Sequence, residues 1–240
     1  MVVAVFGDAH AHAEALDAVI GAAEASGAEA LWSLGDMIGT RPDAAYAVRR
    51  VRAECSVALL GNHDYGATGG VELDRFKAGR ESIEHAISEL SDDDLAWMRS
   101  RRPAARRFGV QCWHGGPRNP VWEFVTARNA AECLAVQRES LALVGHTHAA
   151  AAFLAGARRP VGVEVGEPLE LGEETWLLNP GAVGAPVPPR RGWWDGLDSD
   201  AVLGAFWLEL DLEARVATWW RAPYDPEPAR SRARALGLDG

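Results

Sequence analysis

Five short apolar runs in this chain end in glycine next to an Asp, Asn or His side chain. The runs close as "FGDAH", "LGDMIG", "LGNHD", "CWHGG" and "VGHTH". A buried strand that ends in a carboxylate or an imidazole must place that group where a partner or ligand compensates its desolvation. The neighbouring glycines permit sharp chain exits and close backbone approach. The five strand ends are therefore candidates for one shared site.

The first half of the chain alternates strand and helix patterns. Strand-type apolar runs lie at 2–6, 31–34 and 57–60, and helical spacing of apolar residues covers 13–26 and 42–52. Strands that alternate with helices pair in parallel and give a layered α/β fold. Because the carboxyl ends of such strands meet at one sheet edge, the polar clusters are expected to meet there.

The pattern changes after residue 65. Residues 65–107 predict a helical insertion, with helices near 80–90 and 92–101 and Ser91 as the N-cap of the second. We interpret the whole chain, 1–240, as a single domain that carries this insertion.

Strand patterns return at 108–113 and 141–144, with a helix near 127–138 between them. From about residue 150 onward, alternating residues and turns predict antiparallel strands. The Pro- and Gly-rich segment 185–200 is expected to be a surface loop.

Charge and cysteine content exclude several functions. The formal net charge of −10 argues against a duplex nucleic-acid binder, although bound metal would let an acidic protein take a small phosphate substrate. No apolar stretch is long enough to predict a membrane span, and the N-terminus has no signal-peptide pattern. Cys55, Cys112 and Cys133 are odd in number and lack CxxC spacing, which argues against a disulfide framework and a thiolate zinc site. We expect a cytoplasmic protein.

The strand-end side chains form a candidate ligand set: Asp8, His10, Asp36, Asn62, His114, His146 and His148. Imidazole, carboxylate and amide donors suit divalent ions such as Mn, Fe, Zn or Co. The set is larger than one ion with an open position requires, and two ions about 3.5–4 Å apart would use it fully. Asp36 is the candidate bridge. Any one of these residues alone would be an ordinary N-cap or core group, but five clusters in this order argue against chance.

The motif series resembles the calcineurin-like metallophosphoesterase superfamily. It consists of Asp8-x-His10, Gly35-Asp36-x-x-Gly39, Gly61-Asn62-His63-Asp64, His114 and Gly145-His146-Thr147-His148. The segments "LLNPGAVGAP" and "HGGPRNPVWEFV" are similar to bacterial phosphodiesterase and diadenosine-tetraphosphatase-like members of that superfamily.

The resemblance implies a four-layer αββα fold, in which a β-sandwich flanked by helices surrounds two divalent ions. We expect Mn, with Fe, Zn, Ni or Co as alternatives. One ion would be held by Asp8, His10, Asp36 and His148, and the other by Asp36, Asn62, His114 and His146. A hydroxide that bridges the ions would attack phosphorus in line. His63 would stabilise the transition state or protonate the leaving oxygen, and Asn62 and His63 would contact the substrate.

Three further assignments are less constrained by the motifs. Gly39 occupies the place where some relatives carry an acid that orients the catalytic histidine, so Asp64 is the remaining catalytic candidate for that task. His12 either starts a helix or contacts substrate. Arg118 either clamps a phosphate or is a solvated loop arginine.

The sequence thus predicts a dinuclear metal-dependent phosphoesterase that acts on a phosphodiester or nucleotide. A phosphomonoesterase or dinucleoside-polyphosphate hydrolase is the alternative. A non-catalytic scaffold is a third hypothesis, against which the presence of His63 and of the full ligand set argues. The expected partner is a small, nucleotide-like phosphorylated substrate. We expect no binding to duplex nucleic acid or to a membrane, and the sequence leaves the oligomeric state open.

Overall fold

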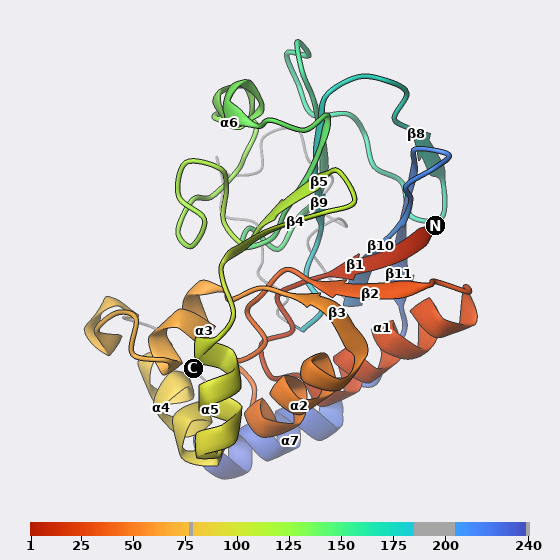
Figure 1. Ribbon diagram of the computed structural model, residues 1–240. Helices are drawn as coiled ribbons and strands as arrows, with labels where there is room; N and C mark the ends of the chain where they lie inside the picture. Colours follow the sequence, from red (N-terminus) through yellow and green to blue (C-terminus); the bar gives the residue numbers. More distant parts are fainter. Residues whose placement is uncertain (77–78, 185–204, 239–240) are drawn as a thin grey trace.

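Two β-sheets pack face to face, and helices cover their outer faces (Figure 1). The computed structural model describes residues 1–76, 79–184 and 205–238. The expected loop at 185–200 lies outside the described residues. The observed arrangement confirms the α/β class and the helix–sheet–sheet–helix layering.

The first sheet has six strands in the order β3-β2-β1-β10-β11-β8. They are β1 (Val2–Phe6), β2 (Ala30–Ser33), β3 (Cys55–Ala58), β8 (Pro168–Glu170), β10 (Ala205–Asp211) and β11 (Val216–Ala222). Strands β1, β2 and β3 pair in parallel through the crossover helices α1 (Ala13–Ala25) and α2 (Ala44–Glu54), whereas the other pairs are antiparallel.

Strand β1 is apolar throughout because both of its faces are buried. Val3 and Val5 belong to the core between the two sheets, whereas Ala4 and Phe6 pack with the helical layer. A strand covered on both sides does not show the polar alternation of a half-exposed strand.

The second sheet has five strands in the order β4-β5-β6-β9-β7. They are β4 (Ala104–Arg107), β5 (Val110–Trp113), β6 (Leu141–Val144), β7 (Ala150–Leu154) and β9 (Trp176–Pro180). The expectation of antiparallel pairing after residue 150 is right for β7 with β9 and for β10 with β11. It is wrong for β9 and β6, which are parallel. Helix α6 (Ala130–Val136) covers the outer face of this sheet.

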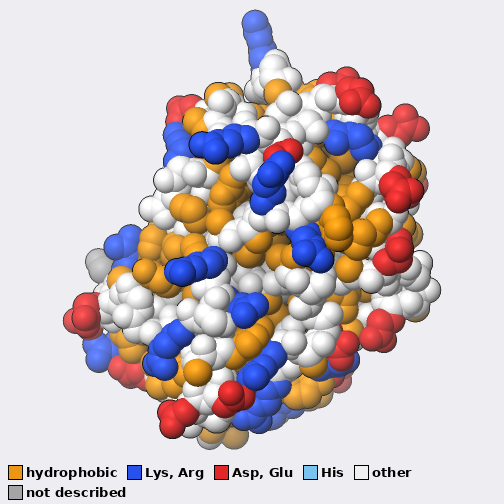
Figure 2. Space-filling model, in the orientation of Figure 1, with side chains coloured by type: hydrophobic (Ala, Val, Ile, Leu, Met, Phe, Trp, Pro, Cys, Tyr) orange, Lys and Arg blue, Asp and Glu red, His pale blue; other side chains and the backbone are white. Residues whose placement is uncertain are grey.

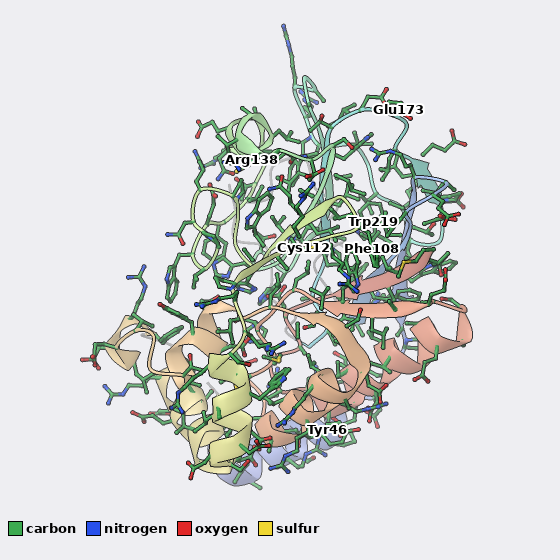
Figure 3. All side chains as sticks on the ribbon, viewed as in Figure 1. Tyr46, Phe108, Cys112, Arg138, Glu173 and Trp219 are labelled. Atoms are coloured by element: carbon green, nitrogen blue, oxygen red, sulfur yellow. The ribbon has the colours of Figure 1, made fainter. Side chains whose placement is uncertain are left out.

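The space between the sheets holds the large side chains that fix their separation. Trp219 of β11 and Cys112 of β5 lie in this core, and Cys112 is fully buried, as a small core residue would be (Figure 3). Phe108, on the turn between β4 and β5, is 56% exposed.

The described residues between 62 and 99 form helices below the strand ends, whereas residues 104–107, which were expected to belong to the helical insertion, form strand β4. The helical part contains α3 (Asn62–Ala67), a short 3-10 turn η1 (Leu73–Arg75), α4 (Arg80–Glu89) and α5 (Asp92–Arg99). Ser91 caps α5 as predicted, because its hydroxyl accepts from the Asp94 N–H at 3.2 Å and the Asp94 carboxylate accepts from the Ser91 N–H at 3.1 Å.

Helix α7 (Glu227–Leu236), which the sequence analysis did not predict, packs on α1.

In the described ranges, no helix has the length and apolar content needed to cross a bilayer. The face of the molecule shown in Figure 2 carries dispersed basic side chains among apolar and neutral atoms, and acidic groups lie mainly at its edges. The single-domain interpretation stays a prediction.

Candidate metal centre

The strand-end loops hold the predicted ligands in an unusual backbone conformation. Positive φ values occur at Asp8 (56°), His10 (48°), Asp36 (51°), His146 (65°) and His148 (63°). Left-handed backbone costs a residue other than glycine about 1–2 kcal/mol. Such strain persists where the surrounding structure over-determines it, and it is concentrated at functional sites.

Four of the predicted ligands form one cluster. The Nε2 atoms of His10 and His148 lie 3.0 Å apart. His10 Nε2 is 3.6 Å from Asp36 Oδ2, and His148 Nε2 is 3.5 Å from Asp8 Oδ1. One donor atom from each of the four residues fits within 4.8 Å of the others, which is a separation that a single cation can bridge.

The second cluster is arranged around His114. Its Nε2 lies 3.1 Å from Asn62 Oδ1, 3.2 Å from His146 Nδ1 and 3.6 Å from Asp36 Oδ2. Asp36 therefore stands between the two clusters, where the sequence analysis placed the bridging carboxylate.

The tautomer of His114 shows what this cluster requires. Its Nδ1 lies 2.9 Å from the Leu34 carbonyl, which can only accept, so Nδ1 carries the proton. The Nε2 of the neutral ring then presents a lone pair toward the oxygens of Asn62 and Asp36, which are themselves acceptors. Lone pairs that converge in a buried space fit a cation and repel each other without one.

Burial controls the protonation of the centre. Desolvation lowers the pKa of His10 and of His146 well below the usual value, and it also lowers the pKa of His114. Desolvation, together with the charges of Asp64 and Asp8, raises the pKa of Asp36 well above its usual range. Neutral imidazoles are the ligand form of histidine. A cation at this site would offset the desolvation and the repulsion from the neighbouring carboxylates, and would so favour the ionised form of Asp36 that binds metal.

Two glycines are required by the close packing of the ligands. A Cβ atom at Gly39 would lie 2.0 Å from His10 Nδ1, and one at Gly61 would lie 2.0 Å from Asp36 Oδ1. Gly39, where some relatives carry an acid, thus provides the space that the His10 ring occupies.

His63 lies beside the first cluster, with its ring centroid 4.8 Å from that of His10. Desolvation, together with the charges of His148 and His114, lowers the pKa of His63 to about 3. Its Nδ1 is buried and has no hydrogen-bond partner among the described residues. The neutral ring can offer one N–H to a ligand.

The structure places Asp64 differently from the sequence expectation. Its carboxylate accepts backbone N–H groups from Gly61 (2.9 Å), Met37 (3.2 Å) and Ile38 (3.1 Å). No hydrogen bond joins it to His63 in the described part of the chain. Desolvation raises the pKa of Asp64 to about 6, against the effect of these donors. Asp64 ties the second ligand loop to the third.

His12 and Arg118, the two expected substrate contacts, bind other groups of the protein in the structure. His12 is the N-cap of α1, with its Nδ1 3.5 Å from the Ala15 N–H. Arg118 forms ion pairs with Glu123 and Glu132, which take up its donors. Local helix capping and loop anchoring explain both residues without a substrate.

Two features of the site were missed by sequence reasoning. The Asn179 side chain donates to the Gly145 carbonyl and to Thr147 Oγ1, both at 2.9 Å, and so holds the loop that carries His146 and His148. The motif "LLNPGAVG" contains this residue, and its Oδ1 also accepts the Gly181 N–H at 2.8 Å in the turn that follows. The Phe124 ring lies on His146, and an isolated aromatic residue in a loop gives no periodic signal.

The fold and the paired clusters together define a member of the calcineurin-like phosphoesterase superfamily. The domain that defines this superfamily matches residues 1–193, and the chain belongs to it.

The chain is similar over nearly its whole length to a solved metallophosphoesterase from Sphaerobacter thermophilus. The two are 29% identical, with a TM-score of 0.84 over 99% of this chain and 94% of that one. A solved hypothetical protein from Pyrococcus horikoshii OT3 shares the fold, with a TM-score of 0.74 over the same shares of the two chains and 15% identity. An uncharacterized protein of Methanocaldococcus jannaschii is 27% identical over 190 residues, which cover 77% of this chain and 76% of that relative.

Proposed function

We propose that this chain is a phosphoesterase that binds two divalent cations and hydrolyses a phosphodiester or nucleotide substrate. The observation that carries the proposal is the set of lone pairs that converges around Asp36, with His114 Nε2 unprotonated and directed at acceptor oxygens. One cation is assigned to Asp8, His10, Asp36 and His148, and the other to Asp36, Asn62, His114 and His146.

The cations and the residues that hold them have different roles in the proposed reaction. When bound, the divalent cations neutralise charge on phosphoryl oxygens and lower the pKa of water at the site. Desolvation lowers the pKa of His10, His114 and His146, so these three buried ligands stay neutral and their lone pairs are free for coordination. The strand-end loops hold the metal-ligand atoms in place before substrate binds. Polar groups that are preorganised in this way stabilise a transition state.

His63 is assigned to the phosphoryl group. Its low pKa, about 3, makes the ring neutral near pH 7. A neutral ring is a poor proton donor at that pH, but it can hydrogen-bond an oxygen on which charge develops. We therefore favour stabilisation of the transition state over protonation of the leaving oxygen.

The test is hydrolysis of bis-p-nitrophenyl phosphate beside p-nitrophenyl phosphate, with metal-stripped protein resupplied with Mn. We expect diester turnover that chelation abolishes and Mn restores. Turnover of the monoester alone would replace the diesterase assignment with a phosphomonoesterase. Turnover that persists after complete removal of metal would refute the metal dependence.

His63→Ala is the variant that tests the catalytic assignment, with His85→Ala as its control. His85 lies on α4, with its Nε2 3.7 Å from Glu89 Oε1, and it is outside both ligand clusters. We expect the His63 variant to bind Mn as the wild type does and to lose about 100-fold or more in kcat, as loss of one transition-state donor typically costs. The His85 variant should keep full activity. An unchanged kcat in His63→Ala would contradict the role.

A further inference from the structure

One proposed ligand, His148, has little direct support from its own backbone. Its φ of 63° is left-handed, its side chain is 12% exposed, and its N–H forms no hydrogen bond within the described residues. The other histidine of this loop, His146, is held directly, because its N–H donates to the Asp8 carboxylate at 3.1 Å. His148 therefore depends on the residues on either side of it for its position.

Strand β9 holds the chain on both sides of His148. Before this residue, the Asn179 amide donates to Thr147 Oγ1 at 2.9 Å. After it, Ala150 of β7 pairs with Pro180 of β9. His148 thus lies one residue from a side-chain hydrogen bond and two residues from the start of a β-ladder, so the end of β9 limits where its imidazole can lie.

The Asn179 amide has only one orientation that satisfies its neighbours. Its Oδ1 accepts the Gly181 N–H at 2.8 Å, and its Nδ2 donates to the Gly145 carbonyl and to Thr147 Oγ1, both at 2.9 Å. Reversal of the amide would direct its NH₂ at the Gly181 N–H and its oxygen at the Gly145 carbonyl. The side chain is buried, and a buried set of hydrogen bonds that is fully satisfied makes its surroundings rigid.

Asn179 is itself fixed by both sheets. Its main chain belongs to β9 of the second sheet, where it pairs with Ala151 of β7. Its carbonyl accepts the indole N–H of Trp219 at 2.8 Å, and Trp219 is a buried residue of β11 in the first sheet. The position of the amide is therefore set by the packed interior, and not by the strand-end loop that the amide supports.

We propose that Asn179 is a positioning residue that holds His148 in place for the cation of the first cluster. The inference rests on the proposed function, because His148 is a ligand only if that cation binds. The cation of the second cluster depends less on this amide. Its ligand His146 has a hydrogen bond of its own to a carboxylate, and the Gly145 N–H donates to the His114 carbonyl at 2.8 Å.

The variants that test this role remove the support and leave the ligands in place. Asn179→Ala removes both side-chain donors. Thr147→Val removes only the acceptor hydroxyl, whereas Thr147→Ser keeps it. Gln137→Ala is the control, because the Gln137 amide also donates to two backbone carbonyls, those of Glu139 and Trp176, and Trp176 lies at the other end of β9.

Each protein is stripped of metal and titrated with Mn, and the free Mn is measured from its EPR signal. We expect the wild type to bind two Mn ions. Asn179→Ala and Thr147→Val should bind one of them about 10- to 100-fold more weakly, which is the usual loss when a group that orients a metal ligand is removed. The other ion should keep its wild-type Kd, as should both ions in Thr147→Ser and Gln137→Ala.

Equal weakening of both ions in Asn179→Ala would mean that Asn179 only stabilises the fold, and it would overturn the proposal. Unchanged binding of both ions would overturn it as well. If Asn179→Ala does not fold, Thr147→Val decides by the same two criteria.

A ligand variant identifies the affected cation. His148→Ala removes the ligand itself, so it should lose the same Mn site that Asn179→Ala weakens. In the double variant, Mn binding should be the same as in His148→Ala alone, because the effects of residues that act through one another do not add. Further weakening in the double variant would show that Asn179 acts on the other cation, and it would overturn the assignment.

Failure of this inference can be told apart from failure of the proposed function. Amide hydrogen exchange of the metal-free protein needs neither Mn nor substrate, and it should be faster at residues 145–147 in Asn179→Ala than in the wild type. Selective loss of one Mn, without diester turnover by the wild type, would refute the phosphoesterase and retain the positioning role. Diester turnover with equal loss of both Mn ions would retain the phosphoesterase and refute the positioning role.

Discussion

Substitution of Asp64 by Asn tests whether this carboxylate holds the ligand loops together or acts on His63. In the structure, Oδ2 accepts the Gly61 and Met37 N–H groups, and Oδ1 accepts the Ile38 N–H. Asn has a single acceptor oxygen. In the more favourable orientation of the Asn amide, its oxygen keeps the bonds to the Gly61 and Met37 N–H groups, and its NH₂ faces the Ile38 N–H. The buried Ile38 N–H is then left without an acceptor.

The size of the effect follows from that one unsatisfied donor. A buried donor left unsatisfied costs about 1–3 kcal/mol, and loss of the negative charge weakens the two remaining bonds. Because these donors belong to the loops that carry Asp36 and Asn62, we expect the variant to lose Mn affinity as well as stability.

The measurement is urea unfolding and Mn titration at pH 8, where Asp64, with its pKa raised to about 6, is ionised in the wild type. Asp94→Asn is the matched control, because Asp94 also accepts from the backbone at the start of a helix but lies outside both ligand clusters. We expect both variants to lose stability and only Asp64→Asn to bind Mn more weakly. If Asp64→Asn kept wild-type stability and Mn affinity and changed only the pH–rate profile, the positioning role would be wrong and a direct action on His63 would be favoured.

Three further predictions follow from the same geometry. Gly61→Ala would place a Cβ atom 2.0 Å from Asp36 Oδ1, so Mn titration should show at least about tenfold weaker binding. The control is Gly21→Ala, where a Cβ atom would meet nothing within 4 Å. This variant should be neutral or should stabilise α1 by about 0.5–1 kcal/mol. The Arg49 hydrogen bond lowers the pKa of Asp94 to about 2, so its contribution to stability is complete above pH 4 and is lost as the pH falls through 2. Since Arg49 is exposed, the stability difference between wild type and Asp94→Asn in urea should be at most about 1 kcal/mol at pH 7 and should shrink at pH 3. A constant difference would contradict this. Removal of metal by chelation should lower the free energy of unfolding by about 2.7 kcal/mol for each of the two cations, relative to Mn at 100 times its Kd, visible as a lower Tm in circular dichroism.

The parallel strands and the positions of the predicted ligands could be read from the sequence because each carries a local signal. The run 2–6 is short and rich in valine, which favours a strand, and a glycine followed by Asp marks its end. Parallel strands bring their carboxyl ends to one edge, so the order of the motifs alone implied that the side chains converge.

The missed elements lacked such a signal. Strand β4 reads "AARR" because it is a half-exposed edge strand, and α7 buries only Ala229 and Ala233. The parallel pairing of β9 with β6 is set by tertiary topology, since a strand's alternation is the same in either direction. His12 and Asp64 have the residue types of site groups, and in the structure both side chains accept backbone N–H groups three residues away.

The strained ligand loops of the centre brace one another through main-chain contacts. Asp8 N–H donates to the Gly35 carbonyl at 2.9 Å, and His10 N–H donates to the Asp36 carbonyl at 3.0 Å. The Asp8 carboxylate accepts the His146 N–H at 3.1 Å, which joins the loop of one sheet to that of the other. Because protein hydrogen bonds already fix these loops, cations need not order them. Metal should therefore stabilise the folded protein mainly by relieving repulsion among converging lone pairs, and the chelated protein should remain folded with its two sheets intact.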